Sequence, residues 1–274
     1  MDNIKHFILT RFNIASPGRE MKIRLQPEWL EKRFKLFEEL CLPSVKSQTC
    51  QDFEWIVFFD EKTPVEYHQK IYQLQSLFPF RAEFTGMCEM NRVCPQFVAS
   101  IGKGEGDWLL TTRLDSDDMI AIEFVGRLRS LLTQRRRQIV NFTNGTILSL
   151  NSGKPTLYIH RDNSNPFVSL LEPFNNKICT IWGEQHVNLD RLAPITQVGD
   201  FPAWMQVVHG DNVSNRIKGV RVPIRKHAVQ FPYLTNIVLT KLETSVEITM
   251  ENFTLVPLRS IREGVRSLAK RVIN

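Results

Sequence analysis

The sequence predicts an α/β protein in which a mostly parallel sheet is flanked by helices. In the first half of the chain, short apolar runs alternate with segments whose apolar residues recur every three or four positions. This order is typical of parallel strands joined by crossover helices. The second half is less regular and is interrupted by prolines, which predicts irregular structure on that side.

The first strand is expected at residues 7–9, followed by a polar loop. A helix is expected over residues 29–40, where apolar residues have helical spacing, and Pro43 is expected to end it. Residues 53–59 read Phe-Glu-Trp-Ile-Val-Phe-Phe, which predicts a buried central strand closed by Asp60.

The same alternation continues toward the middle of the chain. A second amphipathic helix is expected over residues 67–77. Glycines within residues 102–106 mark a turn into a third strand at residues 108–110. An acidic segment follows that strand, and another helix is expected over residues 124–132.

The composition is that of an ordinary globular protein. The chain has 274 residues, a formal net charge of +6, 42% hydrophobic and 23% charged residues, which excludes disorder, collagen and coiled coil. No apolar run is long enough for a transmembrane helix, and no signal peptide is recognisable. We therefore expect a cytoplasmic protein. Five cysteines without a C-x-x-C pair are expected to be unpaired thiols: Cys41, Cys50, Cys88, Cys94 and Cys179.

We divide the chain into one domain over residues 1–235, with halves 1–132 and 133–235, and an extension over 236–274 containing a strand and a basic amphipathic helix. Such a helix can lie on an anionic membrane surface, here the inner face of the membrane. Alternatively, it packs on its own domain and leaves its basic face in solvent. No nucleic-acid contact is expected, because no aromatic-basic stripe accompanies the charge.

The segment 113–118 reads Arg-Leu-Asp-Ser-Asp-Asp and follows the third strand. In open parallel sheets, ligands bind beyond the carboxyl ends of the strands. Carboxylates this close repel one another unless a cation neutralises them. Mg²⁺ or Mn²⁺ held by one or two carboxylates and by substrate phosphates would do so. The alternative is a helix start at which these side chains cap backbone N–H groups.

Several segments resemble known glycosyltransferases. Residues 42–60, with a helix end containing Ser and Gln-Thr before a strand ending in Asp, resemble the opening of inverting nucleotide-sugar glycosyltransferases with the GT-A fold. Residues 109–118 resemble their strand with the D-x-D metal motif. Residues 6–13, 112–118 and 204–212 are most similar to the bacterial rhamnosyltransferase family.

This resemblance extends from residue 6 to about residue 215. It implies a GT-A fold and a metal-dependent enzyme that moves a sugar, such as rhamnose, from a nucleoside diphosphate sugar to a hydroxyl, with inversion. The acceptor would be a glycan or a lipid-linked molecule, as in polysaccharide biosynthesis. The loop at residues 60–63, Asp-Glu-Lys-Thr, departs from the Asp-Asp-Gly-Ser of the broader GT-A pattern.

The leaving nucleoside diphosphate is dianionic, so a metal and nearby cations must absorb its charge. We assign Asp115 and Asp117 to the metal, with Asp115 also contacting the donor, and His209 as a later metal ligand. For His209 the alternative is a packing role. Candidate cations, which could equally be solvated surface residues, are Arg11, Arg92 and Arg113.

Thr10 and Asp60 stand at the ends of two predicted strands and are expected to line the nucleoside pocket. The general base is expected to be Asp200, at the N-cap of a helix that begins with Phe-Pro, with Glu184 as the alternative.

Trp182 and Trp204 are candidates for stacking on acceptor sugars, although tryptophans are more often core residues.

Two other functions fit parts of the pattern. A metal-dependent phosphotransferase or phosphatase could use Asp115 as nucleophile and Asp117 as acid. A catalytically inactive carbohydrate-binding protein of the same fold would keep the site without the base.

Overall fold

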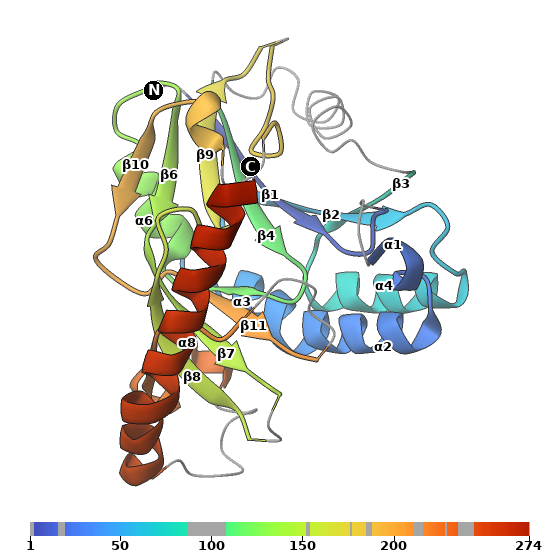
Figure 1. The fold of residues 1–274 in the computed structure, drawn as a ribbon. Helices are drawn as coiled ribbons and strands as arrows, with labels where there is room; N and C mark the ends of the chain where they lie inside the picture. Colours follow the sequence, from blue (N-terminus) through green and yellow to red (C-terminus); the bar gives the residue numbers. More distant parts are fainter. Residues whose placement is uncertain are drawn as a thin grey trace.

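The structure is a computed structural model of the chain. It describes residues 3–15, 20–86, 108–151, 154–175, 177–184, 188–210, 216–227, 229–234 and 244–273. Two sheets form its centre, and helices cover the larger of them (Figure 1). The mostly parallel α/β architecture expected from the sequence is confirmed.

The larger sheet has seven strands in the order β10-β6-β9-β4-β1-β2-β3. Strand β1 pairs in parallel with β2 on one side and with β4 on the other, while β9 is antiparallel to its neighbours β4 and β6. The strands are β1 (Ile4–Arg11), β2 (Glu54–Asp60), β3 (Arg81–Thr85), β4 (Trp108–Asp115), β6 (Gln138–Phe142), β9 (Val168–Pro173) and β10 (Ile195–Val198).

The strand order reverses between β1 and β4, because the chain proceeds from β1 outward to β2 and β3 and then returns to the other side. Ligands of open α/β sheets bind beyond the carboxyl ends of the strands at such a switch point. The ends of β1 and β4, at Arg11 and Asp115, are therefore the expected place for a ligand.

The less regular second half forms most of a second sheet, in the order β12-β8-β7-β11-β5. Its strands are β5 (Met119–Ile120), β7 (Asn144–Ser149), β8 (Thr156–Arg161), β11 (Trp204–Val208) and β12 (Val220–Val222). The short β5, directly after the acidic segment, joins this sheet by pairing antiparallel with β11. The acidic segment therefore lies where the chain passes from one sheet to the other.

The helices are α1 (Glu20–Ile23), α2 (Pro27–Leu36), α3 (Leu42–Lys46), α4 (Glu66–Leu77), α6 (Phe124–Leu131) and α8 (Ser245–Ile273), with 3-10 turns at Leu189–Arg191, Ile224–His227 and Pro232–Leu234. Contrary to expectation, Pro43 does not end the helix expected over residues 29–40. A π-helical turn, Phe37–Cys41, joins α2 to α3, and Pro43 lies in the first turn of α3. The helix continues past Pro43, and the wider π-helical turn lies where the proline ring would otherwise meet the preceding turn of an α-helix.

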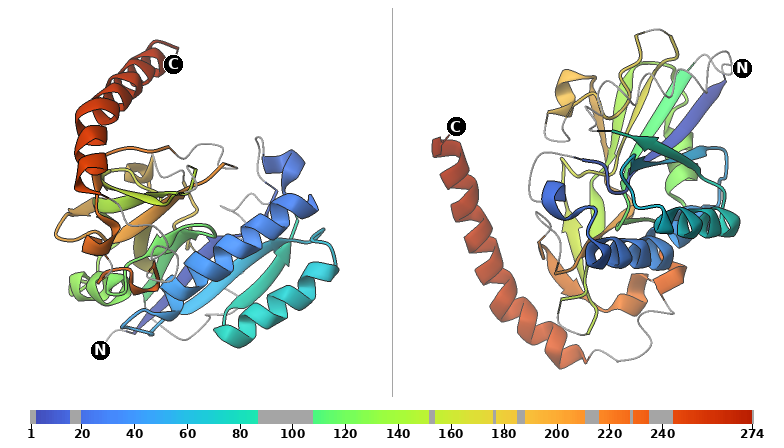
Figure 2. Two further views of the ribbon diagram at one scale, coloured as in Figure 1. Left: turned by 90° about the horizontal axis from the view of Figure 1, so that it is seen from below. Right: turned by 90° about the vertical axis from the view of Figure 1, so that its right-hand side faces the viewer.

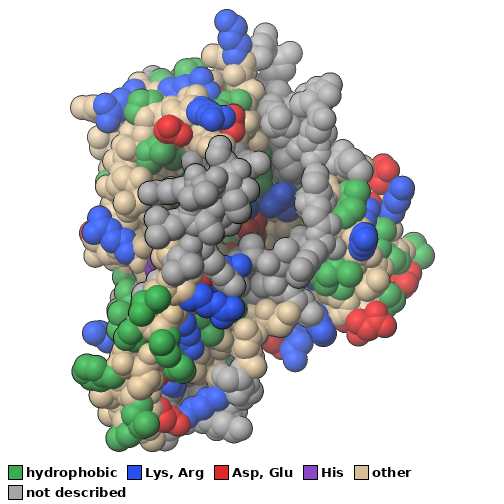
Figure 3. Space-filling model, viewed as in Figure 1, with side chains coloured by type: hydrophobic (Ala, Val, Ile, Leu, Met, Phe, Trp, Pro, Cys, Tyr) green, Lys and Arg blue, Asp and Glu red, His purple; other side chains and the backbone are tan. Residues whose placement is uncertain are grey.

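Helix α8 lies on the outside of the molecule in both views of Figure 2. In the space-filling view, hydrophobic side chains gather along its lower part (Figure 3). The described part of the C-terminal extension, residues 244–273, is helical and contains no strand. None of the described helices is both long and apolar enough to cross a membrane.

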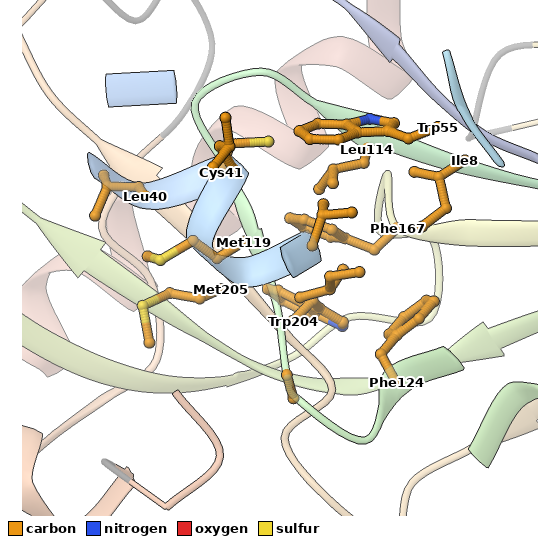
Figure 4. Close-up of a cluster of buried hydrophobic side chains, with 14 of the residues drawn as sticks. Ile8, Leu40, Cys41, Trp55, Leu114, Met119, Phe124, Phe167, Trp204 and Met205 are labelled. Atoms are coloured by element: carbon orange, nitrogen blue, oxygen red, sulfur yellow. The ribbon is translucent and has the colours of Figure 1, made fainter. Parts of the chain in front are cut away.

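The main hydrophobic core lies between the two sheets and the α2–α3 segment (Figure 4). Trp204, on β11, is fully enclosed in it. Its ring stacks on Phe167 at a centroid distance of 5.0 Å, and its indole N–H donates to the carbonyl of Phe142 at 2.7 Å. Gly145 faces the ring so closely that a Cβ there would lie 2.1 Å from it. The proposed role of Trp204 in acceptor stacking is therefore wrong, because the core covers both of its faces.

Candidate active site

The carboxyl ends of β1 and β4 bring an arginine and an aspartate together. In the parallel register of the two strands, Arg11 is the partner of Asp115. A hollow on the face shown in Figure 3, over the region of β1 and β4 in Figure 1, exposes basic and acidic side chains. The candidate site therefore lies at the switch point of the sheet.

Two guanidinium groups flank one tryptophan at this place. The Cζ atoms of Arg11 and Arg113 each lie 4.5 Å from the ring centroid of Trp182. Arg113 also donates to the Asp115 carboxylate, with Nη2 3.2 Å from Oδ2. Burial acts to raise the pKa of Asp115, but Arg113 and Arg11 outweigh it, and the pKa lies below its usual value. Arg11 and Arg113 thus bring two cations beside this carboxylate, a setting that suits an anionic ligand.

Hydrogen bonds from two strands hold Trp182 in this position. The buried carboxylate of Glu172, on β9, accepts the Thr180 N–H at 2.8 Å, and Thr111 Oγ1, on β4, accepts the Ile181 N–H at 2.9 Å. Thr180 has a φ of 58°, an uncommon conformation for a threonine that these bonds hold in place. The loop before Trp182 is therefore anchored to the sheet.

Three polar atoms in this region are buried without a hydrogen-bond partner among the described residues: Arg113 Nε, Ser116 Oγ and Trp182 Nε1. Buried polar groups are nearly always hydrogen-bonded, so each unpartnered group needs an explanation. A ligand with acceptor oxygens beside Arg113 and Trp182 would provide the missing hydrogen-bond partners of these two side chains. Trp182, which the sequence assigns to an acceptor, thus lies beside the two arginines.

A second cluster lies around Asp117. Its Oδ2 is 2.7 Å from Nη1 of Arg33, on α2, and 3.0 Å from Nε2 of His209, just after β11. Burial acts to raise the pKa of Asp117, but Arg33 and the hydrogen bond with His209 lower it to about 2. Arg33 in turn packs over the ring of Trp29, with Cζ 4.6 Å from the centroid. The carboxylate is therefore ionised, and its charge is balanced from two other elements.

The sequence interpretation did not identify Arg33. A signal was present, because Arg33 shares the face of its helix with the buried residues Trp29, Leu30 and Phe34. A charged residue on an apolar helix face needs a partner of opposite charge.

Asp118 has a structural function. Its Oδ1 accepts the Val207 N–H at 2.8 Å, which fixes β11 beside the acidic segment. Burial, followed by Asp117 and Asp115, raises the pKa of Asp118 well above its usual value. No helix begins at these aspartates, because a turn leads directly from β4 into β5. The helix-cap alternative is therefore wrong.

The side chains around Asp117 supply some of the ligands that a divalent metal needs. Carboxylate and imidazole are ligands for Mn²⁺, and Asp117 and His209 are already in contact. Among the residues that the structure describes, no three His, Cys, Asp or Glu side chains form a complete metal-binding group. Mg²⁺ sites commonly use one or two carboxylates and take their other ligands from water and substrate phosphates. The residues thus fit a metal that binds together with a phosphate ligand.

Two residues expected in the nucleoside pocket are engaged elsewhere. Thr10 is fully buried and its Oγ1 accepts the indole N–H of Trp55 at 3.0 Å, so its side chain lines no pocket, contrary to expectation. Asp60 lies at the end of β2 as expected, where its Oδ2 is 3.0 Å from Nε of Arg24. Arg24 is a further cation at this edge that the sequence interpretation did not identify.

The two candidate bases have different surroundings. Asp200 lies in the loop between β10 and β11, and no helix follows it, so the expected N-cap is wrong. Its carboxylate is 55% exposed and pairs with Arg127 at 2.8 Å. Strand β10 is three strands from β4, about 14 Å at ordinary strand spacing. Glu184 lies two residues after Trp182, is partly buried, and has no partner among the described residues.

Some expected residues cannot be placed. Arg92, Cys88 and Cys94 lie outside the described residues. The described cysteines, Cys41, Cys50 and Cys179, are free thiols.

Residues 5–221 match the model of the family described as "Putative rhamnosyl transferase". The chain belongs to this family. The match includes Arg11, the acidic segment and His209. The resemblance inferred from the sequence motifs is confirmed. A search of curated protein sequences found no match.

Solved structures give weaker similarities. TarS of S. aureus aligns with a TM-score of 0.44 and 14% identity over 74% of this chain and 37% of TarS. A shorter form of TarS in complex with UDP has a TM-score of 0.44 and 12% identity over 74% of this chain and 60% of that one. A 4-diphosphocytidyl-2C-methyl-D-erythritol synthase aligns with a TM-score of 0.44 and 13% identity over 77% of this chain and 96% of the synthase. The chain thus spans about two fifths of TarS.

Proposed function

We propose that this member of the rhamnosyl transferase family moves a sugar, rhamnose being the first candidate, from a nucleoside diphosphate sugar to a hydroxyl of an acceptor. One observation carries the proposal: Arg11 and Arg113 flank Trp182 beside Asp115 at the carboxyl ends of β1 and β4. The diphosphate would lie against this cluster.

Arg11 and Arg113 would neutralise the charge that develops on the diphosphate as the bond to the sugar breaks. Both guanidinium groups are already oriented by Trp182, so little reorganisation is needed when the donor binds. The buried Nε1 of Trp182 and Nε of Arg113 would donate hydrogen bonds to phosphate oxygens. Arg24 and Asp60, at the end of the neighbouring β2, would border the nucleoside side.

Asp117 and His209 would hold Mn²⁺ or Mg²⁺, with Asp115 or the diphosphate completing the shell. The metal would act as a Lewis acid toward the leaving diphosphate. Arg33 neutralises Asp117 in the absence of metal, so it would have to give up part of this contact when the metal binds.

Glu184 is our first choice for the general base that takes the proton from the acceptor hydroxyl. It follows Trp182 closely in the chain, whereas Asp200 is engaged by Arg127 several strands away. A base positioned across the sugar from the leaving group would lead to inversion. The acceptor would be a glycan or a lipid-linked molecule.

Thermal shift against a panel of nucleoside diphosphates with Mn²⁺ tests donor binding. A ligand at a hundred times its dissociation constant stabilises a protein by about 2.7 kcal/mol, so at least one nucleotide should raise the melting temperature of the wild type. Arg113→Ala should lose this shift. The matched control is Arg129→Ala, because Arg129 also pairs with an aspartate, Asp52, but lies outside the cluster.

As a check that each variant is folded, it should show a cooperative thermal unfolding transition before nucleotide is added. If no nucleoside diphosphate stabilises the wild type, or if Arg113→Ala responds as the wild type does, the proposal is wrong.

A further inference from the structure

Helix α8 contacts the rest of the molecule through polar side chains. Each of its described acidic residues pairs with a basic residue of the body: Glu247 with Lys154 at 3.0 Å, Glu251 with Arg221 at 2.7 Å, and Glu263 with Arg216 at 3.1 Å.

Further hydrogen bonds reinforce this polar contact. Tyr158 donates to Glu251 at 2.6 Å. The side chain of Asn252 accepts the Arg221 N–H at 2.8 Å and donates to the Arg221 carbonyl at 3.0 Å. Arg221 belongs to β12, an edge strand of the smaller sheet, so α8 covers backbone groups that would otherwise be exposed.

The opposite face of α8 is apolar and lies in solvent. Met250, Phe253 and Ile261 are 63%, 81% and 65% exposed. With 3.6 residues per turn, Met250 and Ile261 lie about half a turn from Asn252, which binds the body. We call the set the apolar stripe; its described members are Val246, Met250, Phe253 and Ile261.

This arrangement is the reverse of an ordinary surface helix, which turns its apolar face to the core and its charged face to water. As in one of the two expectations, the helix packs on its own domain, but it does so largely through polar side chains. Monomeric soluble proteins rarely expose a long apolar patch, and such a patch marks an interaction site. Figure 3 shows this patch on the face that also contains the hollow of the candidate site.

The charge of the helix indicates what covers the stripe. Arg262 is exposed and begins a basic segment that continues in the sequence with Arg266, Lys270 and Arg271, whereas Arg259 is paired with Glu251. Glu263, the acid within that segment, is already paired with Arg216. A helix with aromatic and aliphatic residues on one face and arginines and lysines elsewhere suits the surface of an anionic bilayer.

The helix also argues against a long coiled coil with a second copy. Pro257 lies inside α8, between Phe253 and Ile261. A proline in a helix interior removes a backbone hydrogen bond and kinks the helix, so the apolar stripe is not a continuous heptad seam.

We propose that α8 lies in the surface of an anionic membrane, with the apolar stripe from Val246 to Ile261 among the acyl chains. The ion pairs with Lys154, Arg216 and Arg221 keep the body attached to the helix on the other side. If the proposed function is correct, the hollow then faces the membrane, where a lipid-linked acceptor would be present.

Vesicle flotation of the full chain tests this proposal. The wild type should float with vesicles of phosphatidylcholine and phosphatidylglycerol, less with phosphatidylcholine alone, and less at high salt. The double variant Phe253→Ser/Ile261→Ser should reduce the bound fraction about tenfold, because two exposed side chains no longer enter the lipid. The variant should fold, since neither side chain is buried. Arg262→Glu should weaken binding to the anionic vesicles alone.

The matched control is Tyr72→Ser, because Tyr72 is 68% exposed on α4 and should not affect flotation. The proposal is overturned if the wild type binds neither vesicle or if the double variant floats as the wild type does. It is equally overturned if the wild type sediments as a dimer and the double variant sediments as a monomer, because a second copy then covers the stripe. Nucleotide binding by the same preparations distinguishes failure of this proposal from failure of the proposed function.

Discussion

Nε2 of His209 lies 3.0 Å from Oδ2 of Asp117, although 92 residues separate them in the chain. The contact depends on Asp118, whose carboxylate binds the backbone of Val207 and so holds β11 beside the acidic segment. Asp117 thus faces the site, and Asp118 attaches the smaller sheet to the end of β4. Arg33 completes the cluster from α2.

Arg33→Gln should destabilise the metal-free protein by about 3 kcal/mol, because removing one partner of a buried ion pair leaves the other charge uncompensated. Mn²⁺ should restore part of this loss if Asp117 binds metal. Thermal or urea unfolding with and without Mn²⁺ measures both effects. Arg129→Gln, whose partner Asp52 is exposed, should have little effect in either condition. Equal destabilisation of Arg33→Gln with and without Mn²⁺ would argue against metal at Asp117.

Trp182→Phe should weaken nucleoside diphosphate binding about tenfold, because the aromatic ring is retained but the buried indole N–H can no longer donate to phosphate. Fluorescence or calorimetric titration measures the dissociation constant. Trp108→Phe is the control, since Trp108 lies at the start of β4, at the opposite end of the strand from Asp115. Unchanged affinity in Trp182→Phe would mean that the N–H has no role in donor binding.

Glu184→Gln should lower turnover by about 10² to 10⁴ while leaving nucleotide affinity nearly unchanged, because it removes a proton acceptor without altering the cationic cluster. Steady-state transfer assays and nucleotide titration separate the two effects. Asp200→Asn, which removes the other candidate carboxylate, serves as the comparison. If Asp200→Asn loses turnover and Glu184→Gln does not, the base is Asp200.

His6 should make the protein less stable as the pH falls from 7 toward 4. Burial, followed by Arg129, lowers its pKa from 6.5 to about 3. Between these values the unfolded chain binds a proton that the folded protein does not, so acid favours unfolding by up to about 1.4 kcal/mol per pH unit. Urea unfolding at a series of pH values measures the slope. His6→Gln, which can still bond Thr112, should show a smaller slope, and an equal slope would exclude His6 as its source.

The chain order of strands and helices in the first half could be predicted from local sequence. Buried strands appear as short apolar runs, and amphipathic helices appear as apolar residues at every third or fourth position. The position of Asp115 at the end of a buried strand followed from the same pattern. Arg33 and Trp182 could not be placed from sequence, because the charged groups that they contact lie about 70 or more residues away in the chain. Trp204 was assigned to the acceptor, but its environment depends on Gly145 and Phe167. The spacing of apolar residues in α8 also could not show which face of this helix contacts the rest of the protein.

The central claim is that the cluster around Asp115 and Asp117 binds a nucleoside diphosphate together with a divalent metal. Calorimetric titration of the nucleotide with and without Mn²⁺ tests it most directly. A metal that binds both the protein and the diphosphate strengthens nucleotide binding, and the nucleotide strengthens metal binding by the same factor. The account predicts tighter nucleotide binding with Mn²⁺ in the wild type and no such coupling in Asp117→Asn, with Arg129→Ala behaving as the wild type. Nucleotide affinity that is the same with and without Mn²⁺ in the wild type would contradict it.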